Sequence, residues 1–147
     1  MRGRPAVPWI AAPLLAVAGA VLVTGATAPQ DRSPRTNYAL HCQGCHLPDG
    51  SGKPGAVPDM RGELGRLAAV PGGREFIVQV PGTASAKLDD VQVTALLNWL
   101  VPAMGPPVPG GFRPYTVEEV GRLRRQRLKQ VEPLRSELRR AIAAQPS

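Results

Sequence analysis

The sequence predicts an all-α protein, with one small helical domain and a C-terminal helical extension. Three observations lead to this fold class. Residues 88–101 carry apolar side chains at helical spacing, and helix-start signals occur at Ser33-Pro34 and at Thr116. No strand–helix–strand alternation is visible along the chain.

Composition limits how much stability the domain can draw from its own core. Of the 147 residues, 16 are Gly and 17 are Pro, while aromatic residues account for only 4%. A small domain of this kind buries little apolar surface, so it usually needs a staple such as a disulfide or a bound cofactor. A covalently held cofactor would be such a staple.

The first 28 residues have the pattern of a secretory signal peptide or an N-terminal anchor. Two arginines precede an apolar run over residues 6–23, and small residues follow. Ala26-Thr27-Ala28 is one candidate cleavage site, although Pro29 fits poorly directly after it, and Thr24-Gly25-Ala26 is another. The run is long for a cleaved signal but shorter than the roughly 20 residues of a comfortable membrane span. Export is expected, and cleavage stays open.

Two short helices are predicted in the first part of the domain. Ser33 as N-cap and Pro34 at the first helical position start a helix that runs into Cys42. Residues 47–58 are rich in Pro, Asp and Gly and form a loop. The next helix, over residues 60–69, has an apolar stripe made of Met60, Leu64, Leu67 and Ala68.

Two further helices follow a Pro-Gly turn. The first covers residues 73–80 and ends at Pro81-Gly82. The second covers residues 88–101, is capped by Asp89 and stops at Pro102. Their inward-facing side chains are Phe76, Ile77, Val80, Val93, Leu96, Leu97, Leu100 and Val101.

A Pro- and Gly-rich linker over residues 105–115 precedes a tail over residues 116–147. Thr116 and Glu119 form a capping box that starts a tail helix. Pro133 is expected to break or kink that helix, and a second helical piece follows. The apolar positions of the two pieces are Val120, Leu123, Leu128, Val131, Leu134, Leu138 and Ile142.

The net charge of +7 is concentrated outside the domain. Residues 116–147 hold eight basic and four acidic side chains, whereas residues 28–115 hold eight and seven. A single basic helix without interleaved aromatic residues is weak support for nucleic-acid binding, so no nucleic-acid partner is expected, and the basic residues are interpreted as a solvated face. The apolar stripe of the tail packs most simply on the domain. Docking onto a partner protein or an anionic membrane surface stays open.

The chain is organised around the run His41-Cys42-Gln43-Gly44-Cys45-His46. Its Cys-x-x-Cys-His spacing is typical of a c-type haem attachment site. Two thiols one helical turn apart can each form a thioether with a haem vinyl group, and the adjacent imidazole then lies beneath the ring, where it binds iron. Cys42 and Cys45 are therefore predicted to hold haem c, and His46 is predicted to be the proximal iron ligand.

Two other interpretations of the motif fit less well. A thioredoxin-like redox pair, and hence a thiol–disulfide enzyme, requires a βαβ pattern nearby, which the sequence lacks. A zinc site would have to use the two cysteines and two histidines of the chain. These all lie within six residues, so tetrahedral coordination would be strained.

Four stretches resemble one known family. They are Tyr38-x-x-x-Cys42-x-x-Cys45-His46, Asp49-Gly50-Ser51-Gly52, Val57-Pro58-Asp59-Met60-Arg61-Gly62, and Leu88-Asp89-Asp90 through Trp99-Leu100. Residues 33–101 thus resemble a class I c-type cytochrome, and residues 29–104 are expected to form a helical domain wrapped on one haem. The resemblance implies that the Pro58 carbonyl accepts a hydrogen bond from the His46 imidazole. It also implies that Tyr38 and Trp99 lie near the crossing of the first and last domain helices.

The chain departs from this family on the other face of the iron. Class I cytochromes usually supply a methionine from the loop before the last domain helix, but residues 82–87 contain neither methionine nor histidine. Met60 and Met104 are the candidate distal ligands and Lys87 is a third, whereas His41 is too close to the motif to reach around. An open or water-bound sixth position is the other alternative.

The predicted function is that of an exported mono-haem cytochrome in the periplasm, either soluble or anchored to the inner membrane by its N-terminal segment. It would transfer single electrons between periplasmic redox proteins, as acceptor or small subunit of a dehydrogenase. No catalytic residue is predicted, and an electron carrier fits better than an enzyme. The alternative is a haem protein with an open iron, acting as a ligand sensor or weak peroxidase.

Overall fold

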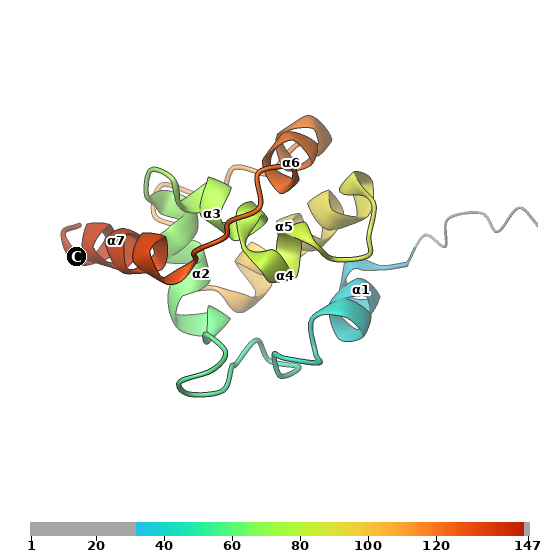
Figure 1. Ribbon diagram of the computed structural model, residues 1–147, viewed down its shortest axis with the longest axis horizontal. Helices are drawn as coiled ribbons and strands as arrows, with labels where there is room; N and C mark the ends of the chain where they lie inside the picture. Colours follow the sequence, from blue (N-terminus) through green and yellow to red (C-terminus); the bar gives the residue numbers. More distant parts are fainter. Residues whose placement is uncertain (1–31, 146–147) are drawn as a thin grey trace, which may run out of the picture. The chain divides into compact units, whose positions relative to one another are not determined.

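The structure is a computed structural model that describes residues 32–145 (Figure 1). The predicted signal segment and its cleavage sites lie outside these residues. The described part contains seven helices and no strand, which confirms the all-α fold class: α1 Pro34–His41, α2 Met60–Ala69, α3 Gly73–Gln79, α4 Pro81–Ala84, α5 Asp90–Met104, α6 Val117–Arg124 and α7 Glu132–Ala143. None of these helices is long and apolar enough to cross a membrane.

Helices α1 and α5 pack against each other, and α5 also contacts α2 and α6. The Ser33 hydroxyl accepts a hydrogen bond from the Thr36 N–H and caps α1, as the sequence predicts. Tyr38 of α1 is fully buried, and its ring centroid lies 5.9 Å from that of Trp99 of α5. Such tilted aromatic pairs are favourable contacts. The position implied for these two rings at the helix crossing is confirmed.

The longest helix, α5, begins where expected and ends later than expected. Asp89 and Gln92 form a complete capping box at its start. The sequence predicts that Pro102 stops the helix, but this proline lies inside the last turn, and α5 continues to Met104. Near a helix end a proline removes only one backbone hydrogen bond, and the Gly105 N–H still donates to the Val101 carbonyl at 3.2 Å. The predicted stripe on α5 is buried.

The segment between α3 and α5 differs in one respect from the prediction. Pro81 ends α3 as expected, but it also begins the separate four-residue helix α4. Proline fits the first position of a helix because its φ is already helical and no N–H is needed there. Val80 serves as the C-cap of α3 and the N-cap of α4. This short helix becomes one wall of the site described below.

The tail is two helices packed on the domain. Helix α6 contacts α3, α4 and α5, and α7 contacts α2 and α3 (Figure 1). The predicted continuation of the first tail helix towards Pro133 is wrong, because α6 ends at Arg124. The chain then pairs with the domain, and the Leu128 N–H donates to the Gln79 carbonyl at 3.0 Å. Pro133 lies in the first turn of α7, directly after its first residue Glu132, where a proline is tolerated.

A buried ion pair ties α6 to α3. The Arg74 guanidinium lies 3.0 Å from the Glu119 carboxylate and 4.0 Å from the centroid of the Tyr115 ring. Both charged side chains are only 14% exposed. The predicted capping box at the start of α6 is therefore only half formed. The Thr116 hydroxyl accepts from the Glu119 N–H, but the Glu119 side chain pairs with arginine and does not return to the Thr116 backbone. Burial opposes ionisation of Glu119, but Arg74 and Arg113 outweigh burial and hold the pKa of this carboxyl below its ordinary value.

The packing of α2 against the chain after α5 predicts opposite effects for two glycines of the same helix. A Cβ on Gly65 would collide with the Pro106 carbonyl oxygen, whereas a Cβ on Gly62 would meet no atom within 4 Å. We expect Gly65→Ala to destabilise the protein by about 3 kcal/mol through overpacking. Gly62→Ala should stabilise it by about 0.5 kcal/mol through helix propensity. Denaturant unfolding of both variants checks this, and equal stabilities would contradict the packing.

The Arg74–Glu119 pair predicts a pH-dependent stability increment. The folded pKa of Glu119 is lowered, so its contribution is complete above the unfolded pKa of a glutamate, about 4.3, and is lost as the pH falls through the folded value. Glu119→Gln should cost about 2 kcal/mol at neutral pH. The difference from the unmodified protein should shrink in acid. Glu118→Gln, which removes an exposed neighbouring carboxylate, is the control, and a similar loss in both variants would contradict this role.

Candidate cofactor site

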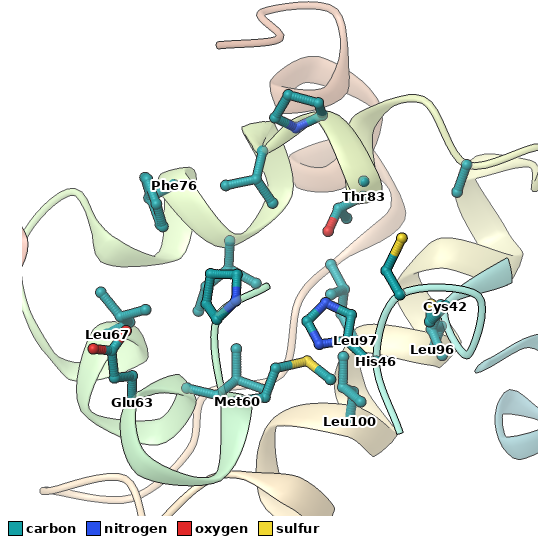
Figure 2. A pocket seen from close by; sticks show the side chains of 18 of the residues that line it. Cys42, His46, Met60, Glu63, Leu67, Phe76, Thr83, Leu96, Leu97 and Leu100 are labelled. Carbon is teal, nitrogen blue, oxygen red and sulfur yellow. The ribbon is translucent and has the colours of Figure 1, made fainter. Parts of the chain in front are cut away.

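A cavity of about 390 Å³ opens between the end of α1 and helices α2 to α5 (Figure 2). Its lining is mainly aliphatic, as is usual for pockets that hold organic ligands. Helix α5 contributes Val93, Leu96, Leu97 and Leu100 to the lining, and α2 and α3 contribute Met60, Glu63, Leu64, Leu67, Phe76 and Ile77. The motif residues Cys42, Cys45 and His46 line the same cavity.

The backbone after α1 brings the motif side chains to the cavity. The Cys42 N–H donates to the Tyr38 carbonyl and closes the last turn of α1. The Cys42 carbonyl then accepts from the N–H groups of both Cys45, at 3.1 Å, and His46, at 2.9 Å. Because of this extra turn, two cysteines separated by two residues both line the cavity. Both thiols are free in the structure, Cys42 half-buried and Cys45 exposed.

The loop after the motif is fixed by hydrogen bonds at several points. The Tyr38 hydroxyl donates to the Leu47 carbonyl at 2.6 Å. Asp49 accepts from both the backbone N–H and the hydroxyl of Ser51, which holds the turn at Gly50. Arg61 of α2 lies 2.8 Å from the Asp49 carboxylate. These contacts tie the loop to Tyr38 of α1 and to Arg61 of α2, so the loop fixes the two helices on this side of the cavity.

The imidazole of His46 is partly buried in this cavity, and its Nδ1 has no hydrogen-bond partner. Burial, together with the nearby charge of Arg135, lowers the pKa of His46, so the ring is favoured in its neutral, ligand-competent form. The bond to the Pro58 carbonyl that the resemblance implies is not formed. That carbonyl oxygen lies close to Gly52, where a Cβ would meet it at 2.5 Å, next to the backbone bridge between Lys53 and Val57.

Sequence reasoning missed two cavity residues, which come from the tail. Val131 and Arg135 line the cavity, although the sequence favours a solvated face for the basic residues of the tail. The Arg135 guanidinium lies 5.3 Å from the centroid of the Phe76 ring, and only 13% of its side chain is exposed. Its sole ion pair is a long one to Glu132, at 3.6 Å, in the part of the chain described. The sequence signal that could have found them is their spacing: Val131 and Arg135 are four residues apart, so they lie on the same helical face.

The candidate distal ligands are found in different places. Met60 lines the cavity, and Figure 2 shows its side chain beside His46. Met104 lies against Gly50, outside the cavity lining. Lys87 is exposed and also lies outside the lining. His41, the last residue of α1, lines the cavity close to Cys42.

Two thiols, a partly buried imidazole with an unpartnered nitrogen, and an aliphatic cavity are the features that a covalently attached haem requires. The donor set fits the group, because thiols form thioethers with the vinyl groups and imidazole binds iron. An all-α fold with this site on the turn after its first helix defines a c-type cytochrome.

Comparison with known proteins agrees with this class. The chain is 33% identical over 128 residues to a cytochrome c-552 of Thermus thermophilus, an alignment that covers 74% of this chain and 86% of the relative. It is 34% identical over 106 residues to a second Thermus thermophilus cytochrome c-552, covering 59% of this chain and 81% of the relative. No family model and no solved structure matches the chain significantly.

The chain therefore belongs to the class I c-type cytochromes, electron carriers that hold haem c covalently. The matched share of the chain is larger than residues 33–101, on which the sequence resemblance rests. The similarity to the Thermus proteins thus extends into at least one of the flanking segments.

Proposed function

We propose that this protein is an exported cytochrome with a single haem that passes single electrons between extracytoplasmic redox proteins. The observation that carries this proposal is the shared cavity wall of Cys42, Cys45 and His46. In this assignment the two thiols form the thioether links, and His46 is the proximal iron ligand. When bound, the haem supplies an iron centre that takes up and releases one electron.

The surroundings of the cavity suit this role. Leucines of α5 exclude water from the inner side, and a low-polarity environment is one of the means by which proteins tune the potential of an iron centre. At the other side Cys45 reaches the surface, so the edge of the cofactor would lie close to a docked partner. Leu40 and Leu47, which flank the motif, are 59% and 56% exposed. They offer an apolar contact surface at this edge.

The partner we propose is a periplasmic dehydrogenase, for which this chain acts as electron acceptor or small subunit. Residues 1–28 would direct export, residues 29–104 would form the haem domain, and residues 105–115 would link it to the tail. Arg135 would face the carboxylates of the haem, since it is the buried cation of the cavity and lacks a close anionic partner among the described residues.

The proposed roles of the two histidines are tested by a matched pair of variants. We expect His46→Ala, matured with a functioning haem-attachment system, to lose most of its covalent haem. His41→Ala should keep its haem and its ferric and ferrous spectra, because His41 precedes the motif. Pyridine haemochrome content per chain is the measurement. Equal haem contents in both variants would contradict the assignment of His46.

Electron transfer itself is tested by voltammetry of the holoprotein. We expect one reversible one-electron couple, and the absence of any couple would count against a carrier. Arg135→Gln should lower the reduction potential by on the order of tens of millivolts, because loss of a cation near the iron disfavours the reduced state. Arg140→Gln, which removes an exposed charge from the same helix, is the control and should change the potential much less.

A further inference from the structure

The wall of the cavity that faces His46 carries no strong iron ligand. This wall consists of the end of α3, helix α4 and the chain after it, and its cavity-lining residues are Phe76, Ile77, Val80, Pro81, Gly82, Thr83 and Ala86. None of these described residues has a thioether, thiol, imidazole or amine. Thr83 is the member of this set with a polar side-chain atom.

Thr83 is placed to interact with a small molecule in the cavity. Figure 2 shows its side chain on α4 with the hydroxyl oxygen pointing into the cavity, on the side opposite His46. Met60, in contrast, lies beside His46 in the same view. A neutral hydroxyl is a weak iron ligand but a good hydrogen-bond donor. Iron held by His46 would therefore meet hydrocarbon and one hydroxyl on its other face.

The tail fixes this wall in place. Arg124 of α6, only 13% exposed, donates to the carbonyls of Ala86 at 2.8 Å, Leu88 at 2.9 Å and Ala84 at 3.4 Å. The same guanidinium pairs with the Asp90 carboxylate at 2.8 Å. One largely buried cation thus satisfies the last backbone carbonyl of α4 and two carbonyls of the segment between α4 and α5. A wall held in this way cannot easily rearrange to bring in a ligand from outside.

Met104 and Lys87 also lie away from this wall. Met104 packs against Gly50, and Lys87 is exposed on the segment that Arg124 holds. Arg127 donates to the Ser85 hydroxyl at 3.1 Å and adds a second contact from the tail. Neither the Met104 nor the Lys87 side chain lines the cavity.

We propose that the wall around Thr83 forms a binding site for small neutral diatomic ligands, such as carbon monoxide or nitric oxide, on the iron face opposite His46. An aliphatic wall favours neutral molecules over anions, because it cannot solvate charge. The Thr83 hydroxyl donates a hydrogen bond to the outer atom of the bound molecule. This proposal rests on the proposed function in one respect, the assignment of His46 as the iron ligand.

The test uses the full-length holoprotein, reduced without oxygen and titrated with carbon monoxide. We expect a five-coordinate, high-spin ferrous spectrum that converts completely and rapidly to the carbon monoxide complex. A six-coordinate, low-spin ferrous spectrum that resists carbon monoxide would overturn the proposal. If Met60→Leu alone then opened the iron to carbon monoxide, Met60 would be the distal ligand and the proposal would be wrong.

Two changes at one position test the wall itself. Thr83→Val should keep carbon monoxide binding and raise the C–O stretching frequency, because the hydrogen-bond donor is lost. Thr83→Met should place a thioether opposite His46, give a low-spin spectrum with a sulfur-to-iron charge-transfer band, and slow carbon monoxide binding. Thr94→Val is the matched control, since the Thr94 hydroxyl donates to the Asp90 carbonyl within α5 and should leave the stretching frequency unchanged.

An unchanged stretching frequency in Thr83→Val, or the same shift in Thr94→Val, would overturn the role of Thr83. Pyridine haemochrome analysis of the same samples separates this proposal from the proposed function. Samples that contain haem but do not bind carbon monoxide overturn the ligand site alone. Samples without covalent haem overturn the proposed function, and with it the basis of the ligand site.

Discussion

The structure depends on one backbone turn, in which the Cys42 carbonyl accepts hydrogen bonds from both Cys45 and His46. This turn extends α1 just far enough to bring both thiols and the imidazole to one cavity. Helix α1 is itself fixed by Tyr38, whose buried ring packs on Trp99 and whose hydroxyl holds the following loop at Leu47. The position of the motif is therefore set by the main helix crossing of the fold, so stability and cofactor geometry have the same origin.

The tail completes the cavity rather than extending away from the domain. Val131 and Arg135 line it directly, and Arg124 holds the carbonyls of the short segment between α4 and α5. A small domain rich in Gly and Pro has few apolar side chains for a core, so added helices and a covalent cofactor supply what is lacking. The excess positive charge of the tail is explained in part by these internal contacts, because the largely buried Arg124 guanidinium satisfies carbonyl oxygens and a carboxylate of the domain.

Local signals predicted the helices, and long-range contacts decided what the sequence could not predict. The caps at Ser33, Asp89 and Thr116 depend on neighbouring residues, and all three side chains accept the capping hydrogen bond. The box predicted at Thr116 is only half formed, because the Glu119 side chain pairs with the distant Arg74. The end of α6 depends instead on the distant pairing of Leu128 with Gln79, which no periodicity reveals. At the site, the spacing of the Cys-x-x-Cys-His motif predicted which residues belong to it, Cys42, Cys45 and His46. The cavity roles of Arg135, Arg124 and Thr83 require the tail and α4 to be seen on the domain.

The central claim is that the motif side chains share their cavity with one covalently attached haem. Intact-mass measurement of the protein, produced with a functioning cytochrome-maturation system, tests this claim most directly. The account predicts the mass of the polypeptide plus one haem, retained after acid and organic solvent have removed any non-covalent cofactor. The mass of the bare polypeptide would contradict it.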